Sequence, residues 1–256
     1  MHTLLSLILA LQIANPLNGL NNGFPPASAS TGCSSWPTLT GQWAGRNPAN
    51  TCTSGCTGTN KVSAWAALQG TTTATQGTSA QQPAYSASAI NGLAAATFST
   101  SYLSFSTAIP IQTPTTFSWY ALVYPTSATT MYMIGSGLTS SFQWGLENVS
   151  GNLKQYVVIT TAGTTYTGTN TIPLNTWTVV AFTLTQSTGA YSFQEIAGGS
   201  FVSDASGTQT TTISNPEQQI GTRSATYFLG QIAEVGYNAA AIPSGIPGAI
   251  HSCYNL

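Results

Sequence analysis

From about residue 61 onward, apolar and polar side chains alternate along short segments that turn residues separate. In one such segment, Phe117, Trp119, Ala121 and Val123 occupy every second position. Successive side chains of an extended strand point to opposite faces, so these four share one face. Repetition of this pattern predicts an all-β domain of two antiparallel sheets.

Further strands are expected in five segments: 142–146, 153–161, 177–184, 190–196 and 228–237. The stretch from Val179 to Phe182 is apolar at every position, which predicts a strand buried on both faces. The tail has a different period, because Ile246, Ile250 and Tyr254 recur every four residues. This spacing predicts a short amphipathic helix packed on the sandwich.

The N-terminus begins with an apolar run of about eleven residues, short of the roughly 20 that cross a bilayer. No membrane span is expected. We expect a retained helix that contacts copies of the chain or a scaffold through Leu4, Leu5, Ile8 and Leu11. The alternative is a cleaved signal peptide, because Ala27-Ser28-Ala29 has the pattern of a cleavage site.

Turn residues interrupt the rest of the first 60 positions, and no periodicity survives between them. We therefore expect residues 1–60 to form the apolar helix and an extended anchoring arm, and residues 61–256 to form the β domain. Trp36 and Trp43 are expected to hold the arm against a neighbouring surface.

The four cysteines allow three pairings. Position favours Cys52 with Cys56, which would close a small loop, and Cys33 with Cys253, which would tie the arm to the C-terminus. Four unpaired thiols are the alternative in a reducing compartment. A zinc site is disfavoured because paired C-x2-C spacing is missing.

Charged side chains are scarce: the 256 residues include five acidic and four basic ones, and the net charge is −1. An ordinary soluble domain is about 25% charged. Acid–base catalysis, hard metals and nucleic acids all require clustered charges. We therefore expect no enzyme, no metal or other cofactor and no nucleic-acid partner. A net charge near zero also favours association, which suggests a homo-oligomer.

Several segments resemble a known superfamily in sequence order: QPAY at 82–85, INGLAAATF at 90–98, SYLSF at 101–105, NTWTVVAFTL at 175–184 and IGTRSATYFLGQIAEVGYN at 220–238. Together they resemble the opening, central and closing strands of the concanavalin A-like (laminin-G-like) jelly roll. The resemblance covers residues 61–256 and implies a jelly-roll sandwich. In style the chain is similar to such modules of bacteriophage structural proteins.

The superfamily includes β-glucanases, lectins and adhesive modules. The glucanase motif E-x-D-x-x-E has no match, and no two glutamates are two or four residues apart, whereas retaining hydrolysis needs carboxyl groups about 5 Å apart. The family's calcium sites use an aspartate, but Asp204, the chain's one aspartate, lies in a segment of turn composition. The family position of Glu234 implies a structural hydrogen-bonding role.

Carbohydrate binding remains, because aromatic, amide and hydroxyl groups suit neutral sugars. The candidate ligand residues are Tyr132, Tyr156, Tyr166 and Tyr191, whose polar tips could reach solvent. The alternative is that each forms part of the core.

Two function classes follow. The first is a non-enzymatic virion surface protein, a bacteriophage capsid-decoration or fibre component. The apolar run at the N-terminus favours this class. Its N-terminal arm would dock on a capsid or tail scaffold protein, and its jelly roll would project, with glycan adhesion as an added role. The second is a secreted or cell-surface lectin.

Overall fold

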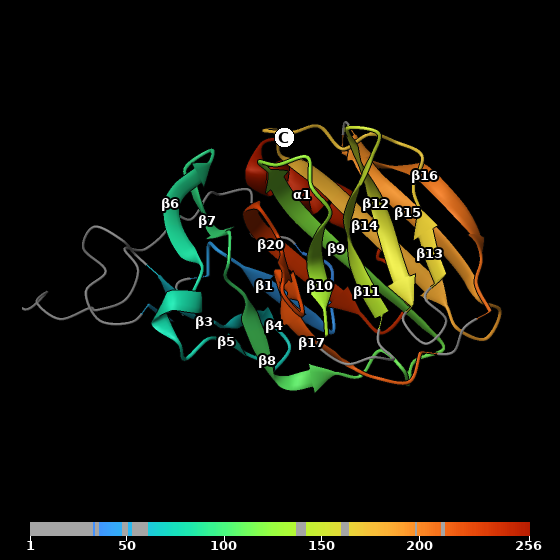
Figure 1. Ribbon diagram of the computed structural model, residues 1–256, viewed down its shortest axis with the longest axis horizontal. Coiled ribbons are helices and arrows are strands. Elements are labelled where there is room, and N and C mark those ends of the chain that lie inside the picture. The colour runs from blue at the N-terminus through green and yellow to red at the C-terminus, as the bar shows by residue number, and fades with distance from the viewer. Residues whose placement is uncertain are drawn as a thin grey trace, which may run out of the picture.

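The computed structural model describes Cys33 and residues 36–47, 51–52, 61–136, 142–159, 164–197, 199–210 and 213–256. Its strands form two antiparallel sheets packed face to face (Figure 1), which confirms the predicted sandwich. The expected N-terminal helix, with Leu4, Leu5, Ile8 and Leu11, lies outside the described residues.

The first sheet has the strand order β16-β15-β14-β9-β20-β1-β4, and β7 also pairs with β20 and with β6. Its strands are β1 (Gly41–Ala44), β4 (Ala67–Gln69), β6 (Ala84–Ile90), β7 (Leu93–Phe98), β9 (Thr116–Pro125), β14 (Thr178–Thr185), β15 (Ala190–Ala197), β16 (Ser200–Thr208) and β20 (Gly230–Asn238).

The second sheet has the order β13-β12-β11-β10-β17-β8-β5-β3-β2. Its strands are β2 (Thr51–Cys52), β3 (Val62–Trp65), β5 (Ala74–Thr75), β8 (Leu103–Ile109), β10 (Met131–Gly135), β11 (Phe142–Val149), β12 (Asn152–Ile159), β13 (Thr164–Thr167) and β17 (Glu217–Ile220). A small hairpin of β18 (Thr222–Arg223) and β19 (Thr226–Tyr227) follows β17, and a 3-10 turn spans Ser79–Gln81.

The main core lies between the sheets, where the predicted alternation directs large apolar side chains inward. On β14, Val180, Phe182 and Leu184 face this core and are almost fully buried. Phe182 of the first sheet packs on Phe142 of the second, with ring centroids 5.1 Å apart. Aromatic contacts of this kind join the two sheets into one packed unit.

The outer side of the first sheet is covered by the helix α1 (Ile246–Tyr254), as the four-residue period predicted. Pro247 occupies the first turn, where its missing N–H has no intrahelical partner to lose. Val179 and Ala181 of β14 face α1, so the strand is buried on both faces as expected. We call this covered side the helix face.

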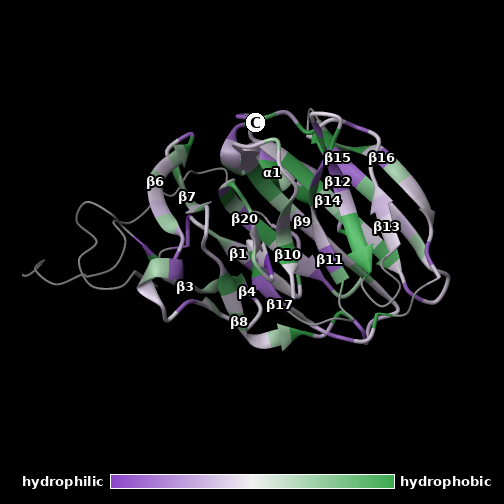
Figure 2. Cartoon of the chain, in the orientation of Figure 1, coloured by the Kyte–Doolittle hydropathy of each residue, from purple (hydrophilic) through white to green (hydrophobic). Residues whose placement is uncertain are grey.

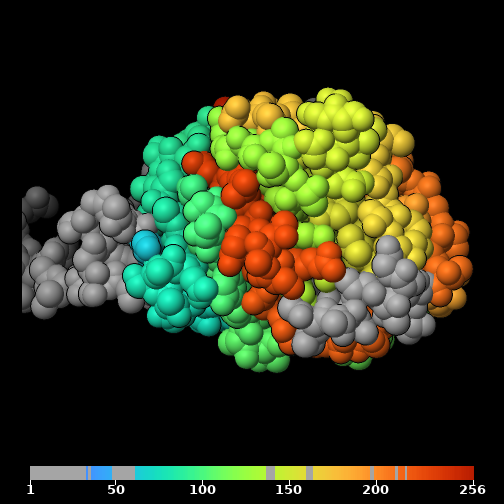
Figure 3. All heavy atoms as spheres, viewed as in Figure 1, coloured from blue at the N-terminus to red at the C-terminus, as the bar shows by residue number. Residues whose placement is uncertain are grey.

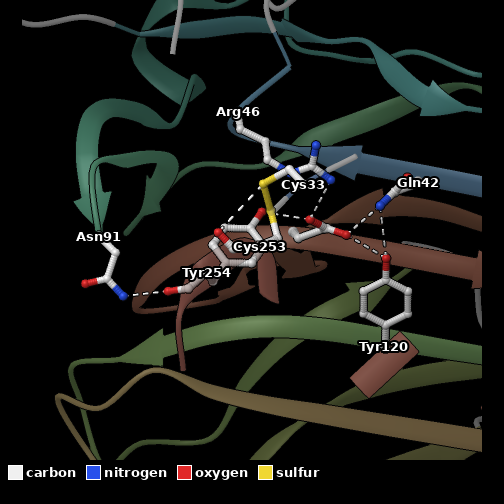
Figure 4. Close-up of a disulfide and its surroundings, with 8 residues drawn as sticks. Cys33, Gln42, Arg46, Asn91, Tyr120, Cys253 and Tyr254 are labelled. Carbon is white, nitrogen blue, oxygen red and sulfur yellow. Dashed lines mark hydrogen bonds and ion pairs between the residues drawn. A yellow bond between two sulfur atoms is a disulfide. The ribbon is translucent and has the colours of Figure 1, made fainter. Parts of the chain in front are cut away.

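A disulfide joins Cys33 to Cys253 of α1, the pairing that position favoured. It ties the segment before β1 to the end of the chain across 220 positions (Figure 4). The side chain of Cys52 and the whole of Cys56 lie outside the described residues, and their pairing stays a prediction.

Two expectations need correction. Residues before position 61 contribute to the sandwich, because β1 pairs with β20 and β4, and Trp43 is fully buried in the main core rather than placed on a neighbouring surface. Asp204 lies in strand β16, not in a turn. Its Ser- and Gly-rich neighbours resemble a turn in composition, but pairing with β15 holds them extended.

Candidate functional site

A network of polar side chains converges on Glu234 of β20 at the helix face. Figure 4 labels four of its partners: Gln42, Arg46, Tyr120 and Tyr254. Its Oε1 accepts hydrogen bonds from Gln42 Nε2 at 2.6 Å and Tyr120 Oη at 2.7 Å. Its Oε2 accepts from Tyr254 Oη at 2.7 Å and pairs with Arg46 at 3.3 Å. Every oxygen of this fully buried carboxylate is satisfied, which agrees with the structural role implied for Glu234.

The same network fixes the protonation of its partners. Burial, reinforced by the Glu234 carboxylate, raises the pKa of Tyr120 and Tyr254 well above the usual value, so both hydroxyls remain donors. Burial opposes the charge of Arg46, but the attraction of Glu234 outweighs it, and the pKa of Arg46 is raised. The network therefore stabilises α1 against the sheet, and its own donors occupy both oxygens of Glu234.

The outer side of the second sheet carries a different arrangement of polar and aromatic side chains from the helix face. Here one row of residues crosses four strands in register: Tyr132 of β10 faces Gly145 of β11, then Tyr156 of β12 and Thr167 of β13. Tyr132, Tyr156 and Val158 form a cluster separate from the main core. We call this surface, with the flanking Glu147, Lys154 and Arg223, the tyrosine face.

Arg223 reaches the tyrosine face from the β18–β19 hairpin. Its guanidinium lies 5.3 Å from the centre of the Tyr132 ring, and its Nη1 donates to Tyr132 Oη at 2.7 Å. In Figure 3 the orange segment that includes this hairpin lies beside the lime and yellow residues of β10 to β12. A planar cation held over an aromatic ring is a positioned hydrogen-bond donor.

Gly145 creates the space that the Tyr156 ring fills. A Cβ at this position would lie 2.1 Å from the Met131 carbonyl oxygen and 2.9 Å from the Tyr156 ring. The rings of Tyr132 and Tyr156 are 5.3 Å apart. Burial raises the pKa of Tyr156, and the neighbouring Tyr132 adds to the shift. The Tyr156 hydroxyl is buried beside that of Tyr132, and a hydrogen bond between these two side chains contributes to the shift.

Charged side chains flank this row. Glu147 faces Lys154 in register, and Thr167 Oγ1 donates to Glu147 Oε1. With Arg223, the tyrosine face therefore holds three of the nine charged side chains of the chain. Polar and apolar positions mix along β11 and β12 in Figure 2. These three side chains provide charged hydrogen-bonding groups on one sheet surface: Lys154 and Arg223 are donors, and Glu147 is an acceptor.

The structure brings the four candidate tyrosines together as two separate pairs, of which one lies on the tyrosine face. Tyr132 and Tyr156 are 5% and 2% exposed, so they form the floor of the tyrosine face and are not exposed platforms. Tyr166 and Tyr191 lie elsewhere, with rings 4.8 Å apart, and pack against the main core.

The functional signal that sequence reasoning missed was the gathering of Arg223, Lys154 and Glu147. The alternation around Tyr156 could have placed Lys154 and Glu147 on its face, because they lie two positions from Tyr156 and Gly145.

A hollow beside α1 is a second place where a ligand could bind. Its lining includes Trp177, His251 and Ile250. Trp177 is half-buried and packs on Tyr124, with ring centroids 5.3 Å apart. Most of the lining is apolar, so it offers few groups that could orient a polar ligand.

Among the described side chains of the tyrosine face Glu147 is the one carboxylate, whereas glycoside hydrolysis by retention uses two about 5 Å apart. In the part of the chain that the structure describes, no helix is both long and apolar enough to cross a membrane.

No protein-family model matches the chain, and no curated protein matches it significantly. Among solved structures, domain 4 of AbnA, a GH43 extracellular arabinanase from Geobacillus stearothermophilus in complex with arabinotriose, is 21% identical; the match covers 83% of this chain and 98% of that one, with a TM-score of 0.55.

Two further solved structures have lower TM-scores. A putative carbohydrate-binding protein from Bacteroides ovatus is 20% identical, covers 62% of this chain and 46% of that one, and has a TM-score of 0.48. A heptameric SAP-like pentraxin from Limulus polyphemus is 12% identical. The match covers 58% of this chain and 74% of that one, with a TM-score of 0.46. At 21% identity, the match to the arabinanase domain shows the jelly-roll fold alone.

Proposed function

We propose that the protein is a non-catalytic carbohydrate-binding module that binds a glycan on its tyrosine face. The observation that carries this proposal is the asymmetry between the two outer sheet surfaces. The helix face is sealed by α1, and both oxygens of its buried Glu234 are occupied by side chains of the same face. The tyrosine face concentrates half-buried donors and acceptors over two aromatic rings.

Each group has a role suited to a sugar. Arg223 and Lys154 donate to sugar hydroxyls, and Glu147 accepts from them. Lys154 and Glu147 oppose each other in register, so their charges largely balance, which suits a neutral glycan. The bound arabinotriose of the arabinanase domain, the neighbour with a TM-score of 0.55, supports a neutral oligosaccharide as ligand. The Cys33–Cys253 disulfide favours an oxidising, extracellular setting.

A glycan array of neutral and acidic oligosaccharides tests the proposal, followed by calorimetry on the best ligand. Arg223→Gln is expected to weaken binding about tenfold or more, because it removes a charge-assisted donor. Trp177→Ala serves as the control at the hollow beside α1. An array without any hit contradicts glycan binding. Loss of affinity in Trp177→Ala but not in Arg223→Gln contradicts the assignment to the tyrosine face.

The docking of an N-terminal arm on a virion scaffold stays a prediction, supported by the apolar side chains Leu4, Leu5, Ile8 and Leu11. Deletion must stop before Cys33, because Cys33 and β1 belong to the sandwich. A chain lacking residues 1–30 is expected to fold, to bind glycan unchanged and to fail to incorporate into particles. Normal incorporation of this chain would contradict the docking role.

A further inference from the structure

The turn between β11 and β12 carries a short motif that the proposed glycan site does not use. Asn148-Val149-Ser150 has the Asn-x-Ser/Thr pattern of an N-glycosylation sequon, and all three residues are exposed. The hairpin closes at Val149, which faces Asn152 in register. Nothing lies within 4 Å of a Cβ added at Gly151, so the motif stands at an accessible tip.

The contacts of the Asn148 side chain are compatible with a sugar on its amide nitrogen. Its Oδ1 accepts a hydrogen bond from Gly151 N at 2.8 Å, and its Nδ2 donates one to the Ala128 carbonyl. A side-chain amide has two N–H donors. Attachment of a sugar replaces one of these hydrogens and leaves the other, so both contacts can persist in the modified protein.

Ser150 is a costly choice for the turn itself. Its φ is 54° and that of Gly151 is 89°, as a two-residue type I′ turn requires. Asn-Gly is preferred in such turns, and the turn between β6 and β7 has it at Asn91-Gly92. Asparagine and glycine tolerate the left-handed region better than serine does. A hydroxyl at this position, however, is what the third residue of the sequon must supply.

The disulfide and the scarcity of charge give the motif a setting. N-glycosylation takes place in the secretory pathway, where disulfides also form, and the Cys33–Cys253 disulfide favours that setting. The chain is 4% charged with a net charge of −1. A net charge near zero promotes association, and an attached glycan is bulky and solubilising. A glycan would therefore supply the solubility that charge does not.

We propose that Asn148 is an N-glycosylation site and that its glycan keeps this weakly charged protein soluble. The donor is a lipid-linked oligosaccharide pyrophosphate. Asn148 Nδ2 attacks C1 of the first sugar and forms the N–C bond, while the C1–O bond to the pyrophosphate breaks. The pyrophosphate leaves with the bonding electrons, and Nδ2 gives up one proton. This modification is independent of whether the tyrosine face binds a glycan.

Mass spectrometry of the native protein, before and after digestion with peptide-N-glycosidase, tests the proposal. The peptide that contains Asn148 should carry a glycan, which the enzyme removes while converting the asparagine to aspartate. The digested protein should precipitate at a lower concentration than the native one. The new carboxylate would by itself raise solubility, so such a loss belongs to the glycan. An unmodified Asn148 overturns the site, and unchanged solubility overturns the role given to its glycan.

Three variants made in the same host separate the sequon from the fold. Ser150→Gly removes the hydroxyl but suits a φ of 54°, so it should abolish the glycan while its Tm, compared after deglycosylation of both proteins, is equal or higher. Ser150→Thr keeps the hydroxyl and should retain the glycan. Asn152→Gln, at an exposed asparagine of the same hairpin outside the sequon, should also retain it. A glycan on Asn148 of Ser150→Gly would contradict the proposal.

Discussion

The two outer surfaces of the sandwich place their buried tyrosine hydroxyls beside side chains of opposite charge. On the helix face, Tyr120 and Tyr254 both donate to Glu234, and a disulfide and an ion pair close the same region. On the tyrosine face, Tyr132 Oη accepts from the guanidinium of Arg223, and Tyr156 lies beside Tyr132. The helix α1 covers the charged group of the helix face, whereas Glu147, Lys154 and Arg223 of the tyrosine face are partly exposed.

The largest expected effect comes from breaking the covalent closure of the helix face. The double variant Cys33→Ala/Cys253→Ala releases a loop of 220 positions, which by loop-closure entropy lowers the free energy of unfolding by about 5 kcal/mol. Denaturant titration measures the change. Mutation is preferred to reductant, because reductant would also cleave any bond at Cys52 and Cys56. A loss below about 1 kcal/mol would contradict the role given to this disulfide.

The next comparison applies one substitution to both faces. Glu234→Gln leaves Arg46 buried without its charge partner and should cost about 3 to 5 kcal/mol. Glu147→Gln, on the half-exposed tyrosine face, should cost less than about 1 kcal/mol. Equal losses in the two variants would remove the distinction between a structural and a binding surface.

A smaller effect is expected where the tyrosine face depends on one glycine. Gly145→Ala places a Cβ against the Met131 carbonyl and the Tyr156 ring, and should cost about 1 to 3 kcal/mol. Gly77→Ala is the control, since nothing lies within 4 Å of its added Cβ. It should change the free energy of unfolding by less than about 0.5 kcal/mol. A tolerated Gly145→Ala would show that Tyr156 does not need this space.

The sequence predicted the elements whose side chains alternate strongly. The strand containing Phe117 to Val123 and the helix with Ile246 and Ile250 were placed correctly, because burial imposes their periods. β1 was missed, since four residues are too few to show a period, and its place in the sheet depends on a distant partner, β20. Asp204 was misassigned because local composition outweighed pairing with β15.

The candidate site was harder to predict than the fold. Alternation places Tyr156 and Lys154 on one face but cannot say whether that face is core or surface. Arg223 lies 91 positions from Tyr132 along the chain, and only the folded structure brings it over that ring. The contact between Gln155 and β15 likewise joins residues 39 positions apart.

A matched pair of lysine substitutions tests the central claim, that the tyrosine face binds a glycan. Lys154 lies on this face. Lys61 lies elsewhere, just before β3, and donates a hydrogen bond to the Ser79 carbonyl. Calorimetry with the best array ligand should show Lys154→Gln binding at least fivefold more weakly than the unmutated chain, with Lys61→Gln within twofold of it. Unchanged affinity in Lys154→Gln, or an equal loss in both variants, would contradict the account.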